Sequence, residues 1–146
     1  MKQMVLTAHN GVNLQYPLET LADFVQTHAA DSPADRPDLL QQMQYIFTPG
    51  EADGGFMVLG LDEEDQLIGV VAVENAATPQ TGQHRLLCVA LHPNWQGQGH
   101  GRALMRSARM LSKREVLLDL TPDHALAGFF IKMGFEPAGE MLQLKR

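Results

Sequence analysis

The chain has 146 residues, of which 45% are hydrophobic and 19% are charged, and its formal net charge at pH 7 is -6. These values are typical of one globular domain, here residues 1–146, and exclude an intrinsically disordered chain. The acidic balance argues against a nucleic-acid partner, because proteins of that class present a basic face to the phosphates.

The N-terminal part predicts one strand followed by two helices. No long apolar run follows Lys2, and no run of 18 apolar residues occurs, so we expect no signal peptide, no membrane partner and a cytoplasmic location. We expect an extended segment within Gln3–Tyr16. Apolar residues then recur at helical spacing in Leu18–His28 and from about Pro37 to Phe47.

The middle of the chain predicts an antiparallel meander. Bulky and β-branched apolar residues favour strands at Phe56–Leu61 and Leu67–Val73, and the acidic run Asp62–Asp65 between them favours a turn. A third strand is expected at about Arg85–Leu91. It contains the single cysteine, Cys88, whose apolar neighbours indicate a buried structural thiol rather than a nucleophile.

The C-terminal part alternates helices and strands. The pattern predicts a helix from Gly99 to about Leu111, a short strand at Val116–Leu120, and a helix at His124–Met133 that ends at Gly134. A last strand is expected at about Phe135–Leu144. The order of elements therefore predicts an α+β fold, with a mixed sheet that carries helices on its faces.

The most informative stretch joins the third strand of the meander to the following helix. There the strand end Val89-Ala90-Leu91-His92-Pro93 leads into glycines that alternate with polar residues: Gln96, Gly97, Gln98, Gly99, His100, Gly101 and Arg102. Glycines let the backbone turn sharply and approach a ligand closely. The free amides and the dipole of the following helix end then favour an anion such as a pyrophosphate.

Two other phosphate-binding loops do not match these residues. A P-loop requires Lys and Ser or Thr after its last glycine, and this chain has Arg102 and Ala103 after Gly101. A dinucleotide-binding loop that begins at Gly97 requires a small residue where Arg102 stands. A dinucleotide-dependent oxidoreductase is therefore disfavoured.

The stretch resembles the pyrophosphate loop of the GNAT superfamily of acetyltransferases, Gln/Arg-x-x-Gly-x-Gly/Ala, through Gln96, Gly99 and Gly101. A second family element, a helix ending in Lys-x-Gly-Phe, is similar to Ala127–Phe135. The resemblance covers about Leu67 to Phe135. It implies a GNAT-like fold, with a mixed, mostly antiparallel twisted sheet and helices on both faces.

The resemblance also implies a site for acetyl-CoA as cosubstrate. The expected contacts are the main-chain groups of Val89 and Leu91 for the pantetheine arm, and for the pyrophosphate the loop residues Gln96, Gly97, Gln98, Gly99, His100, Gly101 and Arg102. The amide of Val89 is the expected donor to the oxyanion. A cationic helix face formed by Arg102, Arg106, Arg109 and Lys113 is read as solvated, with Arg102 able to reach a phosphate.

The side chains that would carry out proton transfer depart from the family pattern. Phe130 stands where the family often has a proton-donating tyrosine, Asp123 where it often has an asparagine, and Arg85 where some members have a basic glutamate. The sequence therefore does not identify the general base. The candidates, in order of preference, are Glu74 and His84, followed by Asp119 and His124.

These inferences lead to one preferred function and one alternative. We expect transfer of an acetyl group from acetyl-CoA to an amine of a small-molecule or peptide acceptor, by direct attack on the thioester. The acidic balance favours a cationic amine. His92 and His100 lack a third donor at metal-ligand spacing, so we expect no metal. The alternative is a non-catalytic module that binds acyl-CoA. The sequence is also compatible with a homodimer.

Overall fold

One sheet with helices on both faces organises the molecule. The computed structural model describes residues 1–7, 15–29, 39–46, 55–74, 84–112, 116–118, 127–138 and 141–144. In chain order its elements are β1 (Lys2–Thr7), α1 (Leu18–His28), α2 (Leu39–Ile46), β2 (Phe56–Leu61), β3 (Leu67–Glu74), β4 (His84–Leu91), η1 (Pro93–Trp95), α3 (His100–Leu111), β5 (Val116–Leu118), α4 (Ala127–Lys132), β6 (Glu136–Ala138) and β7 (Met141–Leu144). The seven strands lie in the order β1-β2-β3-β4-β5-β7-β6.

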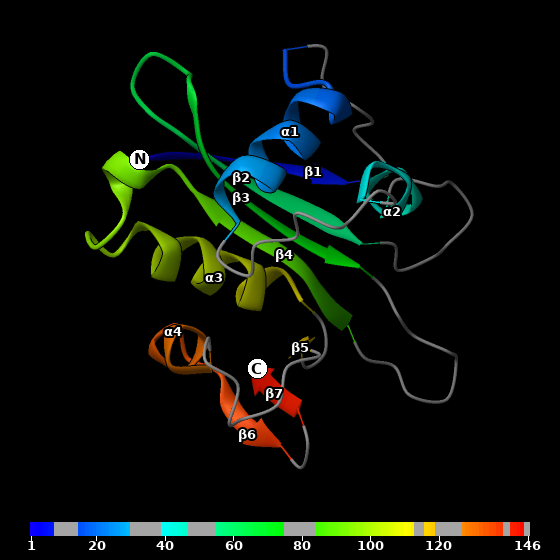
Figure 1. Ribbon diagram of the computed structural model, residues 1–146, viewed down its shortest axis with the longest axis vertical. Coiled ribbons are helices and arrows are strands. Elements are labelled where there is room, and N and C mark those ends of the chain that lie inside the picture. Colours follow the sequence, from blue (N-terminus) through cyan, green and yellow to red (C-terminus); the bar gives the residue numbers. More distant parts are fainter. Residues whose placement is uncertain are drawn as a thin grey trace.

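The predicted fold class is confirmed. Of the neighbouring strands, β4 and β5 are parallel and the other pairs are antiparallel. Figure 1 shows α1 and α2 on one face of the sheet and α3 and α4 on the other. Each face of the sheet therefore carries its own hydrophobic cluster.

The middle residues of the central strands are apolar because both faces of these strands are buried there. In β3, Val70 and Ala72 pack into the cluster under α1 and α2, whereas Val71 and Val73 pack into the cluster under α3 and α4. This placement explains the continuous apolar run, since neither face of the strand contacts water.

Most predicted elements have nearly the bounds that the structure gives them. The helix Leu18–His28 and the strand Phe56–Leu61 agree residue for residue. The side chains Asp119, Asp123 and His124, which the sequence analysis singled out, lie outside the described residues. Among the described residues, no helix is long and apolar enough to cross a membrane.

The prediction of a single strand at Phe135–Leu144 is wrong. The segment forms two strands, β6 and β7, which pair antiparallel from Glu136↔Gln143 to Ala138↔Met141. The strands β6 and β7 therefore run in opposite directions. In the sequence, Gly139 and Glu140 interrupt the apolar residues of this segment, and such an interruption is a turn signal that outweighs the strand propensity of its neighbours.

A β-bulge shapes β4 immediately before the candidate site. Ala72 pairs with Cys88 and Val73 with Leu86, so Leu87 is an extra residue on β4. On its other side, β4 pairs with β5 only through His84↔Val116 and Arg85↔Leu117 among the described residues. A bulged strand bends, and this bend lies between the parallel pairs and Val89–Leu91. The last residues of β4 therefore have an edge that β5 does not cover.

Candidate functional site

The glycine loop lies between the open end of β4 and α3. Gly97 and Gly99 have φ angles of 75° and 86°, in the left-handed region that favours glycine. Gly99 is the N-cap of α3, and its carbonyl accepts the first helical hydrogen bond from the amide of Ala103 at 3.0 Å. The amides of residues 100–102 have no acceptor within the helix and form an anion-binding end.

Hydrogen bonds join this loop to the end of β4. The Gln96 side-chain amide donates to the Leu91 carbonyl at 3.0 Å, and the His92 amide donates to the Ile68 carbonyl of β3 at 2.8 Å. Because successive residues of a strand direct their main-chain groups to opposite edges, the groups of Val89 and Leu91 face away from β3. They face the edge that β5 leaves uncovered.

Two other residues of the predicted loop have structural contacts. The Gln98 side-chain amide donates to the Asn94 carbonyl at 3.0 Å, and the His100 ring packs against Trp95 with ring centroids 5.1 Å apart. Both side chains therefore stabilise the loop.

A cavity of about 570 Å³ lies against this open edge. Its volume falls in the range of small-molecule sites. It is lined by the end of α1 (His28, Ala29), the end of β4 (Val89, Ala90, Leu91), the loop and first turn of α3 (Gln96, Gly97, Gly99, Gly101, Arg102), and α4 (Phe129, Lys132, Met133). Seven of the nine predicted cofactor-binding residues thus lie together at one cavity; the other two are Gln98 and His100.

The wall formed by α4 is oriented by its C-terminal cap. Gly134 has a φ angle of 108°, its amide donates to Ile131, and the amide of Phe135 donates to Phe130. This Schellman motif brings the Phe130 ring against Phe135, with centroids 5.9 Å apart. Phe130 is consequently 2% exposed and belongs to the core, whereas its neighbour Phe129 lines the cavity and is 40% exposed.

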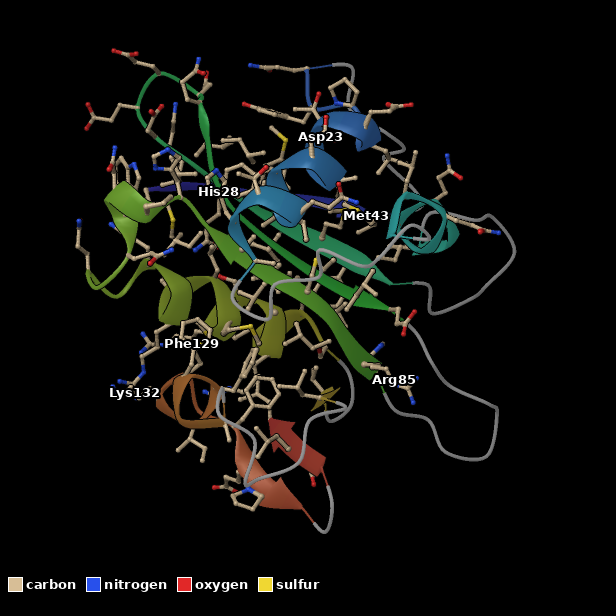
Figure 2. All side chains as sticks on the ribbon, viewed as in Figure 1. Asp23, His28, Met43, Arg85, Phe129 and Lys132 are labelled. Atoms are coloured by element: carbon tan, nitrogen blue, oxygen red, sulfur yellow. The ribbon has the colours of Figure 1, made fainter. Side chains whose placement is uncertain are left out.

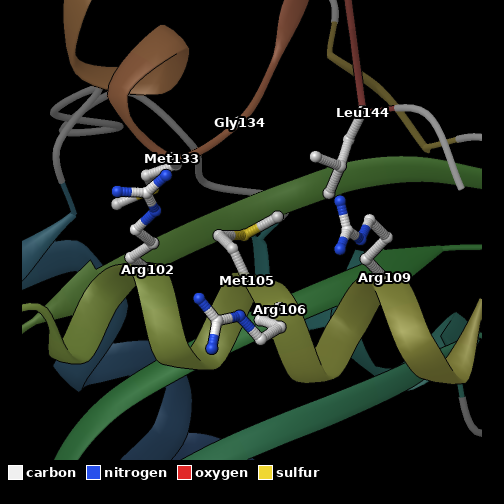
Figure 3. Close-up of a pocket in the computed structure, with 7 residues that line it drawn as sticks. All are labelled: Arg102, Met105, Arg106, Arg109, Met133, Gly134 and Leu144. Atoms are coloured by element: carbon white, nitrogen blue, oxygen red, sulfur yellow. The ribbon is translucent and has the colours of Figure 1, made fainter.

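The charged residues that line the cavity are cations. Arg102 and Lys132 contribute from α3 and α4. Arg102 also borders a smaller pocket of about 100 Å³, together with Arg106 and Arg109 (Figure 3). Within the described part of the chain, the single ion pair joins Lys2 to Asp65, so these three arginines are not neutralised there.

Sequence reasoning missed six residues that line the cavity, namely His28, Ala29, Ala90, Phe129, Lys132 and Met133. Figure 2 shows His28 at the end of α1, and Phe129 and Lys132 on α4. Phe129 and Lys132 lie within the Ala127–Phe135 motif, so the family resemblance could have indicated that they lie near the site. His28 stands in no motif, and its place depends on a contact with β4 about sixty residues later in the chain.

Of the predicted catalytic residues, Val89 lines the cavity and the other two lie further along the sheet. On β3, Val71 pairs with Val89, and Glu74 stands three residues beyond Val71. Three residues span about 10 Å along a strand, so Glu74 lies about that far from the level of Val89. His84 is buried at the start of β4, with its ring 6.3 Å from that of Phe56. Neither side chain belongs to the described lining of the cavity.

Comparisons with known proteins identify relatives of the chain. A family model described as an acetyltransferase (GNAT) domain matches residues 53–137, a span that contains the loop and much of the cavity lining. A protein described as an acetyltransferase from Stachybotrys chartarum is 32% identical over 74 residues. That match covers 46% of the chain and only 32% of the fungal protein.

Solved structures have the same fold at low sequence identity. The structure of Tetrahymena GCN5 superposes with a TM-score of 0.66 at 16% identity, covering 98% of this chain and 94% of that one. The PaiA N-acetyltransferase of Thermoplasma acidophilum, solved in complex with coenzyme A, superposes with a TM-score of 0.58 at 16% identity over the full length of both chains. Because the family model matches more than half of the chain and these structures share its fold, the resemblance predicted from the sequence is confirmed.

Proposed function

Because the chain belongs to the GNAT acetyltransferase family, we propose that it transfers the acetyl group of acetyl-CoA to an amine of a small-molecule or peptide acceptor. The observation that carries this proposal is that the end of β4, the glycine loop and the first turn of α3 line one cavity. The cavity offers an apolar strand edge beside an anion-binding end, which are the surroundings that a pantetheine arm and a pyrophosphate require.

The loop residues supply the proposed pyrophosphate site. A Cβ added at Gly97 or at Gly99 would have no atom within 4 Å, so open space lies beside both residues. The amides of residues 100–102 and the guanidinium of Arg102 would face the phosphates there. Since the site combines main-chain donors with a cation, it fits a pyrophosphate without any metal.

The end of β4 supplies the proposed reaction centre. The main-chain groups of Val89 and Leu91 would align the pantetheine arm, and the amide of Val89 would donate to the oxyanion that forms on the thioester carbonyl. The acceptor nitrogen attacks the carbonyl carbon, the C–S bond breaks, and the thiolate leaves with the electron pair.

A second candidate function is a module that binds acyl-CoA without turning it over. The burial of Phe130, which has no proton to donate, favours this alternative. In both cases we propose a cytoplasmic protein, as the sequence predicts.

Calorimetry and a thiol-release assay distinguish the candidates. The enzyme binds coenzyme A and releases free thiol from acetyl-CoA in proportion to an added amine, tested over a panel of small amines and peptide N-termini. The binding module binds coenzyme A with no release above the rate without enzyme. Absence of coenzyme A binding at millimolar concentration would contradict both candidates.

A further inference from the structure

A histidine from the N-terminal half of the chain lines the candidate cavity. His28 is the last residue of α1 and lies beside the main chain of Val89–Leu91. The next residue, Ala29, forms an isolated antiparallel bridge with Ala90. Main-chain pairing therefore holds the end of α1 against the edge of β4 that β5 leaves uncovered, next to His28 (Figure 2).

Two aromatic rings hold the imidazole of His28. Phe24, one turn earlier on α1, packs edge-on against it with centroids 4.7 Å apart. His92, which follows β4, packs against the same imidazole with centroids 5.1 Å apart and an interplanar angle of 53°. The Nδ1 atom of His92 accepts from the Asn94 amide at 3.2 Å, so the neutral His92 ring carries its proton on Nε2.

The surroundings of His28 disfavour its charged form. Burial, with a smaller contribution from the charge of His92, lowers the pKa of His28 below its usual value of 6.5. The other charged groups that line the cavity, Arg102 and Lys132, are also cations. The carbonyl groups at the C-terminal end of α1 have the opposite effect on the pKa of His28, because they stabilise its protonated ring. A lowered pKa leaves the ring neutral at pH 7 and able to accept a proton.

We propose that His28 is the catalytic base of the acetyl transfer proposed above. As the acceptor nitrogen forms its bond to the thioester carbon, the N–H becomes acidic and passes its proton to a ring nitrogen of His28. The C–S bond breaks, and the thiolate of coenzyme A takes a proton from solvent. The imidazolium of His28 then returns its proton to solvent. This inference rests on the proposed function and adds to it the group that removes the proton.

The position of His28 makes it a stronger candidate than the two predicted from the sequence. It lines the cavity together with Val89, whereas Glu74 and His84 lie towards the opposite end of β4, where Figure 2 also shows Arg85. A base must come within hydrogen-bond reach of the proton that it removes, directly or through one water. Glu74 therefore serves as a matched comparison.

The test measures turnover of His28→Gln and His28→Phe against the wild type from pH 5.5 to 9. We expect kcat at pH 8 to fall by at least about tenfold in both variants, within the ~10² to 10⁴ that positioned bases contribute. Coenzyme A affinity should stay within about twofold of the wild type. The ratio of the wild-type rate to the variant rate should shrink at pH values below the pKa of His28, because the wild-type ring is then protonated and cannot act as a base. Ionisation of the acceptor amine affects both rates equally and therefore cancels in this ratio.

Three further measurements separate catalysis from structure. Exogenous imidazole should restore part of the activity of His28→Ala and leave the wild type unchanged. Glu74→Gln should retain at least half of wild-type kcat. In His92→Gln the neighbouring charge is absent, so the pKa of His28, measured by NMR, should rise, and the acid limb of the rate profile should move to higher pH with it. This last measurement keeps His28 intact and does not depend on how its variants fold.

The outcomes distinguish the two levels of the proposal. Amine-dependent turnover by the wild type, with unchanged kcat in His28→Gln or with an acid limb that does not follow the NMR pKa, would overturn the role of His28 alone. A wild type that binds coenzyme A but releases no thiol with any amine would overturn both the proposed function and this role. Loss of activity in Glu74→Gln but not in His28→Gln would assign the base to Glu74.

Discussion

At the scale of single residues, the two adjacent phenylalanines of α4 have different surroundings. The family motif aligns Phe130 with a proton-donating tyrosine, but the Phe130 ring is buried against Phe135, and Phe129 is the residue that lines the cavity. A hydroxyl at position 130 would enter an apolar cluster, whereas a hydroxyl at position 129 would stand at the cavity.

We therefore predict opposite effects of Phe129→Tyr and Phe130→Tyr. Phe130→Tyr should lower the free energy of unfolding by about 1–3 kcal/mol, the cost of burying an unsatisfied hydroxyl, without raising kcat. Phe129→Tyr should leave stability within about 0.5 kcal/mol and raise kcat by up to about tenfold, since the phenol can protonate the thiolate. Urea denaturation and steady-state kinetics measure both effects. A gain in kcat confined to Phe130→Tyr would show that residue 130 reaches the thiolate.

The glycines of the loop are required for different reasons, which substitutions can separate. Gly99 needs its left-handed φ of 86°, so Gly99→Ala should cost about 1 kcal/mol of stability although a Cβ would meet no atom. A Cβ at Gly101 would lie 2.9 Å from Cε of Met133, the mobile end of a side chain, so Gly101→Ala should fold normally. Gly101→Val should push Met133 into the cavity and weaken coenzyme A binding by about tenfold. Thermal denaturation and calorimetry measure these effects, and wild-type affinity in Gly101→Val would contradict them.

At the scale of elements, the N-terminal end of α3 combines helix amides with an arginine. Arg102 borders both the large cavity and the small pocket, whereas Arg109 borders only the small pocket two turns further along α3 (Figure 3). We predict that Arg102→Gln weakens coenzyme A binding by about 5- to 30-fold, equivalent to about 1–2 kcal/mol for a charge-assisted hydrogen bond. It should also reduce the dependence of affinity on salt.

Arg109→Gln provides the matched control for this prediction. It removes the same charge from the same helix, so it should change affinity by less than about twofold. Calorimetry at 50 and 300 mM salt compares the two variants. Equal losses in both would mean that the phosphates contact the whole arginine face rather than the first turn.

The elements themselves were predictable where local pattern and packing agree. Leu18–His28 has its apolar residues on one face, and the structure buries Leu21 and Val25 there. The loop was predictable because Gln96, Gly99 and Gly101 combine backbone requirements with a fixed spacing. The reversal between β6 and β7 was missed because a short strand pair has few residues in which alternation can appear.

The proton-transfer side chains were not predictable from local pattern. The orientation of Phe129 and Phe130 depends on the cap at Gly134 and on the contact of Phe130 with Phe135. His28 reaches the cavity through the pairing of Ala29 with Ala90, a contact between distant parts of the sequence. Such contacts follow from the complete fold, and no single segment contains them.

At the scale of the whole molecule, the cavity joins elements from both faces of the sheet. His28 and Ala29 come from the face covered by α1 and α2, and Arg102 and Phe129 come from the face covered by α3 and α4. A ligand in this cavity contacts both sets of elements at once. Since unfolding separates them, the unfolded chain has no equivalent site, and binding must stabilise the folded state.

We predict that coenzyme A raises the unfolding temperature in proportion to the logarithm of its concentration. At a concentration of 100 Kd the stabilisation should be about 2.7 kcal/mol, which corresponds to about 5–10 °C for a chain of this size. Pantetheine, which lacks the pyrophosphate, should give a smaller shift at the same concentration, because it cannot use the amides of residues 100–102. Arg102→Gln should reduce the shift with coenzyme A and leave the shift with pantetheine unchanged. Thermal denaturation followed by circular dichroism measures all four cases. NAD serves as the comparison ligand. A larger shift of the unfolding temperature with NAD than with coenzyme A would assign the cavity to a dinucleotide and contradict the proposed binding of acetyl-CoA.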